Sequence, residues 1–250
     1  MEKKKKIPTQ EDIAKLLDEC YQKVQEGIPH VSRSVEDLAN DYLKLYSSNK
    51  LAAKAMIKNQ VAKCATSGFI TGFGGAIALP VAIPANIGSV LYVQMRMIAC
   101  TAYMAGYDLN SDQTQTFVYA CLAGVALNNV LKRFGMKFAE KVAEGMVKKI
   151  PGKVLIAINQ KIGFRLLTKS GTTGLINFTK LIPGVGALVG GGLDLTETRV
   201  IGNRAYKWFM EGDFSPDDTT EELVIDIDPS TEDISSVDTT ESSETGKEES

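Results

Sequence analysis

The side chains that most often carry catalysis are scarce in this chain. Its 250 residues include a single histidine, His30, so a His-based triad would have to be built on that one residue. His30 follows Pro29 in an expected loop, and no G-x-S-x-G nucleophile motif is present. The four cysteines are far apart, with no C-x-x-C pair and no His/Cys cluster at zinc spacing. We therefore expect no catalytic residue, no metal and no cofactor.

Two glycine-containing segments resemble nucleotide-binding loops only in part. The stretch from Gly163 to Ser170 begins and ends like a P-loop, but Thr168 replaces the second glycine and bulky residues lie between. Gly186 and Gly190 resemble part of a dinucleotide fingerprint, without the strand–helix–strand setting that such a fingerprint needs. Close packing of helices explains their spacing better.

Basic residues recur at every fourth position in two stretches, 130–149 and 153–169, which we predict to be helices. The two sets are Arg133, Lys137 and Lys141, and Lys161, Arg165 and Lys169. Each set places positive charge on one helix face, which is typical of binding to lipid phosphate at a membrane surface. Nucleic acid is not expected as a partner, because no aromatic residues interleave with these positions.

The longest uncharged run covers 32 residues, from Cys64 to Met95. About 20 apolar residues suffice to cross a bilayer, but Pro80 and Pro84 interrupt this run near its middle. We predict two short helices, about 65–79 and 85–103, joined at these prolines. Such a hairpin either packs inside a helical protein or enters a membrane.

Small residues and prolines recur in a second Gly-rich apolar segment, residues 171–193, which suggests a second broken hairpin. The residues that define the two hairpins are Gly68, Gly72, Pro80, Pro84, Pro183, Gly186 and Gly190. Arg96 and Asp194 lie in or beside the apolar segments. Because a charge there must pair, reach water or cap a helix, we expect these two to form a structural pair or cap.

The remaining patterns are also helical. Thr9 and Ser34 have the character of helix N-caps and precede amphipathic stretches, and further helices are expected over 50–63, 113–131 and 194–210. The fold class is therefore all-α, a helical bundle of about eight helices. We divide the chain into N-terminal amphipathic helices (1–50), a helical core (51–210) and an acidic tail (211–250).

The charge of the chain is divided unevenly. Residues 211–250 carry 15 acidic residues and one lysine, whereas residues 1–210 carry 27 basic and 15 acidic residues. We expect the tail to be disordered, and its β-prone stretch 221–228 offers a contact for a protein partner. A basic body favours an anionic partner. The cysteine usage and the absence of an apolar stretch after the basic start favour the cytoplasmic side of the cell membrane, with the cytoplasm as the alternative.

Four segments resemble the EcsC family of bacterial proteins, over roughly residues 50–210. They are TGFGGAIALPVAIPANIGSVLYVQMRMI (71–98), GYDLNSDQTQTFVYACLAG (106–124), KIPGKVLIAINQKIGFRLLTKSG (149–171) and LIPGVGALVGGGLDLTETRVIGNRAYKWF (181–209). The resemblance implies a helical, membrane-linked bacterial protein, and it transfers no catalytic residue.

These observations favour a non-enzymatic protein that binds the cytoplasmic face of an anionic membrane through apolar hairpins and basic helices. One alternative is a soluble carrier or enzyme whose hairpins enclose a hydrophobic ligand such as a lipid chain. Another is a pore-forming or effector-like protein, and a third is a soluble module that binds another protein through the tail. The acidic tail also has the charge to compete with lipid for the basic faces.

Overall fold

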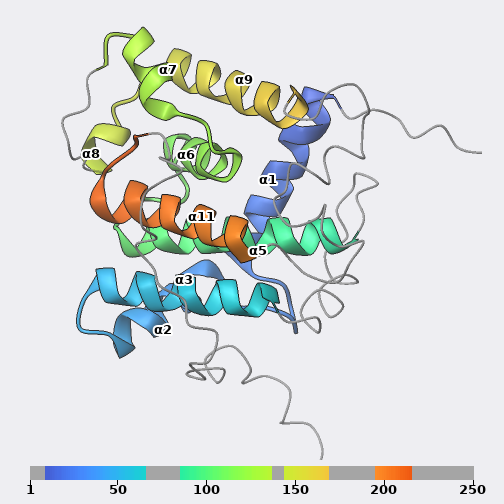
Figure 1. The fold of residues 1–250 in the computed structure, drawn as a ribbon, viewed down its shortest axis with the longest axis vertical. Helices are drawn as coiled ribbons and strands as arrows, with labels where there is room; N and C mark the ends of the chain where they lie inside the picture. The colour runs from blue at the N-terminus through green and yellow to red at the C-terminus, as the bar shows by residue number, and fades with distance from the viewer. Residues whose placement is uncertain (1–8, 66–84, 137–143, 169–194, 216–250) are drawn as a thin grey trace, which may run out of the picture.

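A computed structural model describes residues 9–65, 85–136, 144–168 and 195–215, and the regular elements in these ranges are all helical (Figure 1). The all-α fold class is therefore confirmed. The elements are α1 (Gln10–Glu26), α2 (Val35–Leu45), α3 (Asn49–Ala65), α5 (Ala85–Met104), α6 (Asp112–Ala123), α7 (Leu127–Arg133), α8 (Glu144–Val147), α9 (Gly152–Thr168), α11 (Leu195–Ala205) and the π-helix η1 (Tyr206–Met210). The Gly/Pro-rich parts of the two predicted hairpins and residues 216–250 lie outside the described residues.

The two N-terminal helices begin where the sequence predicts. Thr9 and Asp12 form a reciprocal capping box at the start of α1, with each side chain bonded to the other residue's backbone N–H. The Ser34 hydroxyl accepts the Asp37 N–H and so caps α2. As expected of an amphipathic stretch, α1 buries one face, formed by Ile13, Leu16, Leu17, Cys20, Tyr21 and Val24.

Helix α5 forms the centre of the fold. Every side chain from Val90 to Cys100 is buried, and α5 contacts α1, α2, α3, α6, α11 and η1. A helix surrounded by other helices needs apolar residues on all sides, which explains why this half of the uncharged run lacks a polar face. The helix predicted over 85–103 is thus confirmed, and Val90–Met95 lies in a protein core. No helix among the described residues combines the length and the apolar character that a membrane span requires.

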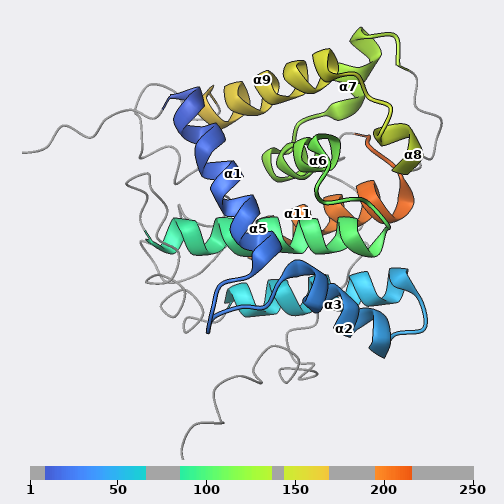
Figure 2. The same ribbon diagram turned by 180° about the vertical axis from the view of Figure 1, so that it is seen from behind.

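The other helices surround α5 on two sides. Figures 1 and 2 show α2 and α3 on one side of it and α6, α7 and α9 on the other, with α1 reaching from α5 to α9. Helix α11 packs against both α3 and α5. The contact is tight, because a Cβ added at Gly202 would lie 2.6 Å from Ile57 Cγ2 and 3.4 Å from Met97 Sδ.

A polar layer lies one helical turn from this contact. On each of the three helices, a polar residue lies three or four positions from the contact residue and on the same face. The pairs are Gln60 with Ile57, Gln94 with Met97, and Thr198 with Gly202. All three polar residues are buried, and Gln94 Nε2 donates to Thr198 Oγ1 at 3.3 Å. Within the described residues, neither amide atom of Gln60 has a hydrogen-bond partner. The α3–α5–α11 interface therefore carries an unsatisfied amide, which costs stability.

Two predicted helices are shorter than the sequence pattern indicated. The helix predicted over 113–131 ends at Gly124, which adopts the left-handed conformation (φ 63°, ψ 36°), and the chain restarts as α7. The prediction of one continuous basic helix over 130–149 is wrong, because α7 ends at Arg133 and Gly135 follows with φ +70°. In both places a glycine supplies a backbone conformation that stops a helix at little steric cost, and the apolar spacing does not reveal it.

The packed chain extends past the last predicted helix. The π-helix η1 places Phe209 edge-on to Tyr107, with ring centroids 5.1 Å apart. Beyond it, Phe214 is buried, and its ring centroid lies 5.3 Å from those of Phe117 and Trp208. The first residues of the segment that the sequence analysis assigned to the tail therefore belong to the core.

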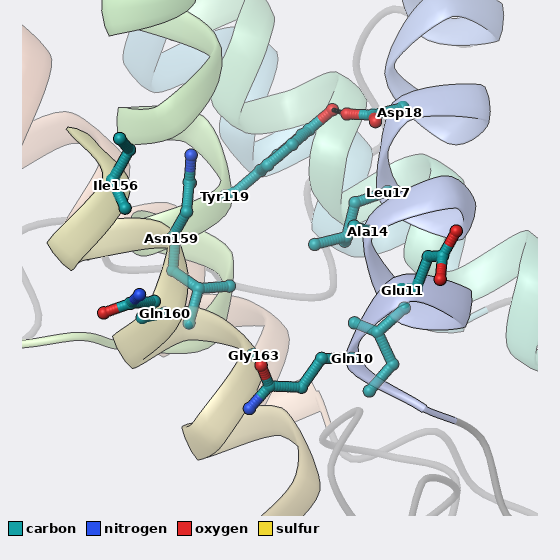
Figure 3. A pocket seen from close by; sticks show the side chains of 12 residues that line it. Gln10, Glu11, Ala14, Leu17, Asp18, Tyr119, Ile156, Asn159, Gln160 and Gly163 are labelled. Carbon is teal, nitrogen blue, oxygen red and sulfur yellow. Dashed lines mark hydrogen bonds between the residues drawn. The ribbon is translucent and has the colours of Figure 1, made fainter. Parts of the chain in front are cut away.

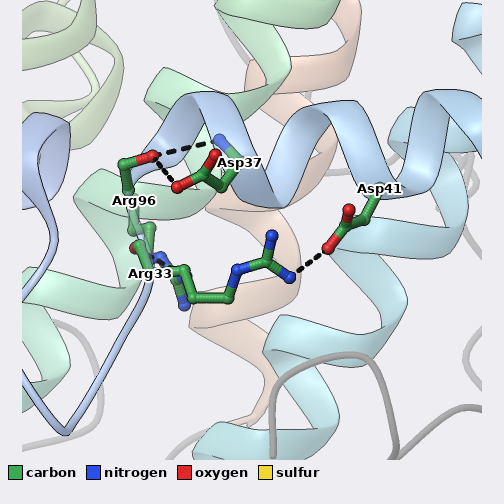
Figure 4. Close-up of polar contacts among 5 residues, drawn as sticks. Arg33, Asp37, Asp41 and Arg96 are labelled. Carbon is green, nitrogen blue, oxygen red and sulfur yellow. Dashed lines mark hydrogen bonds and ion pairs between the residues drawn. The ribbon is translucent and has the colours of Figure 1, made fainter. Parts of the chain in front are cut away.

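The loop between α1 and α2 is fastened to α5 (Figure 4). Arg96 is buried, and its Nη2 donates to the Arg33 carbonyl at 3.0 Å, while the Arg33 side chain pairs with Asp41. One turn before Arg96, the Tyr92 hydroxyl lies 2.6 Å from Ser32 Oγ. Arg96 thus serves a structural role at this loop. Its predicted partner, Asp194, lies outside the described residues.

Candidate functional site

A groove between α1, α6 and α9 is the candidate binding site (Figure 3). It consists of two cavities of about 390 and 460 Å³. The same four residues line both cavities: Asp18 from α1, Tyr119 from α6, and Ile156 and Asn159 from α9. Because this lining is shared, the two cavities are neighbours along α9, and together they are called the groove. Each has the volume of a small-ligand pocket.

Apolar side chains form the floor of the groove. Ile13 and Leu17 reach it from α1 and Ile162 from α9, and all three are buried. Ile156 differs, because 60% of its surface is exposed although it lies where the two cavities meet. A large apolar side chain in that position gains free energy when a ligand covers it.

A hydrogen-bonded wall formed by α1 and α6 also lines the groove. The Tyr119 hydroxyl donates to Asp18 Oδ1 at 2.9 Å, and Gln115 Nε2 donates to Asp18 Oδ1 at 3.0 Å and to the Tyr119 oxygen at 2.7 Å. Behind it, the Tyr21 ring meets Tyr119 edge-on at 5.7 Å. Burial raises the pKa of the Tyr119 phenol well above its ordinary value, so the hydroxyl stays protonated and keeps donating to Asp18. The wall is therefore fixed and polar.

The charge of the groove is negative. Glu11 and Asp18 line the first cavity, and Asp112 joins Asp18 at the second. Among the described residues, no lysine or arginine lines either cavity. Lys15 Nζ lies 3.6 Å from Glu11 Oε1, but both side chains are largely exposed and such a pair is weak. The groove thus favours a cationic ligand.

The groove offers charged and hydrogen-bonding side chains. Its polar side chains are carboxylates, amides, the Thr116 hydroxyl and one phenol held neutral. His30 lies in the α1–α2 loop, exposed and with φ +60°. The described part of the chain holds no group of three His, Cys, Asp or Glu side chains that could bind a metal ion. Gly163 lies within α9, which continues through Thr168, so a P-loop does not form there.

The two predicted basic residues whose side chains the structure describes, Arg133 and Lys161, lie apart. Arg133 is exposed at the end of α7, which packs near the N-terminal end of α9, whereas Lys161 is exposed in the other half of α9 (Figure 1). Arg165 also belongs to α9, whose predicted extent is confirmed. Lys137, Lys141 and Lys169 lie outside the described residues. Helix α7 ends at Arg133, so the helix on which Arg133 lies does not reach positions 137 and 141.

The predicted hairpin residues all fall outside the described ranges. They are Gly68, Gly72, Pro80, Pro84, Pro183, Gly186 and Gly190. The same holds for the stretch 221–228, predicted to contact a protein partner.

The helix ends that flank the two apolar segments are described, and they share an orientation. Ala65 ends α3 and Ala85 begins α5, while Thr168 ends α9 and Leu195 begins α11. Figures 1 and 2 show all four ends directed toward the same side of the body. The described residues that flank both apolar segments therefore lie toward one side of the protein.

Sequence reasoning did not find the groove. Its walls come from α1, α6 and α9, whose residues are about 40 to 140 positions apart in the chain, and only their packing brings them together. The sequence held one weak signal, since Ile156 falls outside the helical spacing of the buried residues Val154, Leu155, Ile158 and Ile162.

The fold and the groove describe an all-α helical protein with a pocket between α1, α6 and α9. The model of the EcsC protein family matches residues 2–210, and the chain belongs to that family. The match includes α1 and α2, which the sequence resemblance did not cover. No curated protein and no solved structure matches the chain.

Proposed function

We propose that this protein is a non-enzymatic helical protein that associates with the cytoplasmic face of an anionic membrane, in a peripheral or re-entrant manner. The observation that carries the proposal is the common orientation of four helix ends, at Ala65, Ala85, Thr168 and Leu195. Apolar groups that leave a protein body on one side are able to enter one leaflet together, while the rest of the body stays in water.

The composition of the two segments supports the same idea. Residues 66–84 contain no charged residue, and residues 169–194 contain two lysines and one aspartate among 26 positions. Val90–Met95, the part of the uncharged run whose side chains are described, is buried in the core around α5. The membrane contact is therefore assigned to residues 66–84 and 169–194 and not to α5.

Basic residues near the same side add an electrostatic attraction. Lys161 is exposed and lies seven residues before the end of α9, or roughly 10 Å along the helix. Each basic residue near an anionic surface contributes about 1 kcal/mol. Arg133, at the other end of α9, contributes less to this face.

Liposome flotation tests the proposal. The full-length protein is floated with neutral and with anionic vesicles and then washed with high salt or with carbonate. Binding that survives carbonate supports insertion of the apolar segments, and binding lost in salt supports a peripheral contact. Lys161→Gln should weaken binding to anionic vesicles about fivefold, the equivalent of about 1 kcal/mol. Lys153→Gln removes the same charge near the start of α9 and should have a smaller effect.

Site-specific labelling tests the orientation itself. Ala62→Cys places an exposed thiol near the end of α3, and Ser47→Cys places one before its start, roughly 20 Å away along the helix. Cys64→Ser removes a native thiol near the first site, while Cys20, Cys100 and Cys121 are buried. Anionic vesicles should protect the introduced thiol of Ala62→Cys from a maleimide and leave that of Ser47→Cys reactive.

Equal labelling of both variants on vesicles would contradict the proposed orientation. If the protein does not float with any vesicle, membrane association itself is refuted and a soluble carrier of a hydrophobic ligand becomes the better hypothesis. Release of a trapped dye would instead favour the pore-forming alternative.

A further inference from the structure

The groove between α1, α6 and α9 has the length of a short helical segment. Its lining runs along α9 from Gly152 to Gly163, which corresponds to roughly 16 Å, or about three helical turns. Ile156 lies between these ends and is the most exposed of the large apolar side chains in the described residues. A partner that fills the groove therefore needs an apolar group at its middle.

The charges of the groove determine the sign of the partner. Glu11, Asp18 and Asp112 line it without a basic residue among the described lining. An anionic ligand is repelled there, and this includes anionic lipid and the acidic residues after position 210. Lysine or arginine side chains are the groups that carboxylates at a groove rim recognise.

One carboxylate oxygen is positioned for such a contact. The hydrogen bonds that Asp18 accepts from Tyr119 and Gln115 both fall on Oδ1. Oδ2 is left to accept a hydrogen bond from a bound cation, while Oδ1 keeps the carboxylate in place. The floor residues Ile13, Leu17 and Ile162 are buried and in position before any ligand arrives, so binding requires little reordering.

The shape of the groove suits a peptide helix. Ile156 is 60% exposed in the middle of the α9 lining, so the groove presents an apolar side chain to solvent. An open apolar groove is the kind of site into which an amphipathic helix packs its apolar face. We infer that the groove binds a basic amphipathic helix of a partner protein, with an apolar side chain on Ile156 and a lysine or arginine on Asp18.

This inference goes beyond the proposed membrane association and does not depend on it. The groove uses α1, α6 and α9, and none of the residues that flank the apolar segments lines it. A protein that fails to float with vesicles still has the groove, so the two proposals can fail separately.

Fluorescence anisotropy of two labelled model peptides tests the inference with the full-length protein. One probe is a 14-residue amphipathic peptide of leucine and lysine with leucines at helical spacing, and the other replaces every lysine with glutamate. The lysine peptide should bind and the glutamate peptide should not. Ile156→Ser should weaken binding of the lysine peptide about tenfold, because a mostly exposed isoleucine becomes covered in the complex. Asp18→Asn should weaken it about threefold.

Matched variants separate the groove from other acidic surfaces, above all from residues 211–250. Leu51→Ser replaces an apolar side chain that is 49% exposed on α3, and Glu36→Gln neutralises an exposed carboxylate on α2. Both should leave the affinity for the lysine peptide unchanged. Equal affinities of Ile156→Ser and Leu51→Ser, or equal binding of the two peptides, would overturn the inference. Ile156 is exposed, so its replacement by serine is compatible with folding, and circular dichroism checks this.

Discussion

Replacement of Gly27 with alanine should destabilise the protein more than any other Gly→Ala change among the described glycines. Gly27 ends α1 with φ +80° and ψ 177°, a region of backbone conformation that is essentially restricted to glycine. Adopting it with a side chain costs roughly 1–3 kcal/mol. The loop that follows carries the bonds from Arg96 to Arg33 and from Tyr92 to Ser32, so its path is fixed by α5.

A steric cost adds to the conformational one. A Cβ at Gly27 would lie 2.7 Å from the Ser32 carbonyl oxygen and 2.8 Å from Arg33 C and Ser34 N. These are backbone atoms, so no rotamer change relieves the contact and the loop itself must move. Overpacking of this kind typically costs about 1–3 kcal/mol. We therefore expect Gly27→Ala to lower the free energy of unfolding by about 3 kcal/mol or more.

Gly106→Ala is the matched control. Gly106 also has a positive φ, +89°, but a Cβ there meets no atom within 4 Å. It should cost only about 1–2 kcal/mol, the conformational part alone. Urea unfolding followed by circular dichroism and by the fluorescence of Trp208, the one tryptophan of the chain, measures both variants. If Gly27→Ala costs no more than Gly106→Ala, the argument from the loop backbone is refuted.

Three further predictions concern buried and partly buried polar groups. Gln60→Met should raise the free energy of unfolding by about 1 kcal/mol in urea titrations, because it removes two amide atoms that lack partners in the described structure. Gln94→Met should raise that free energy less, because it also loses the hydrogen bond to Thr198. Burial raises the pKa of the Cys20 thiol to about 12, and Cys100 and Cys121 are also buried. A thiol reagent at pH 8 should therefore titrate at least three more cysteines in urea than in the native state, and equal counts would contradict this. Burial alone would raise the pKa of Asp213, but the hydrogen bonds from Ser215 and the charge of Lys207 hold that pKa below its usual value. Asp213 therefore stabilises the fold above the pKa of the unfolded carboxyl, about 3.9, and the contribution is lost as the pH falls through the lower folded pKa. The stability difference between wild type and Asp213→Asn should accordingly shrink below about pH 4, and a constant difference down to about pH 2 would be inconsistent with this.

Local signals in the sequence predicted the helices well. The N-caps at Thr9 and Ser34, the buried face of α1 and the extents of α5 and α9 all rest on interactions within a few residues, which a helical pattern records directly. The helix ends at Gly124 and Gly135 were predicted wrongly, because the apolar spacing does not record what stops a helix there. At both sites a left-handed glycine ended a helix although the apolar spacing continued, and spacing carries no information about the sign of φ.

The candidate groove was beyond such reasoning because it depends on tertiary packing. Asp18 and Tyr119 are 101 residues apart and are joined by a hydrogen bond that no local pattern indicates. Arg96 is a second example of a contact that local patterns do not indicate. A charge beside an apolar run was expected to need a partner, and the described partner is the carbonyl of Arg33 in a distant loop. Pattern reasoning identified that Arg96 needs compensation and did not identify what provides it.

The central position of α5 has a consequence for how the chain folds during synthesis. Helices α1, α2 and α3 are made first, but their buried faces pack on a helix that begins at Ala85. Helix α5 in turn is covered by α11, which begins about 90 residues after α5 ends. Contacts so distant in sequence slow folding, and apolar faces stay exposed until their partners leave the ribosome. The nascent chain should therefore depend on chaperones more than its small size and helical content would suggest.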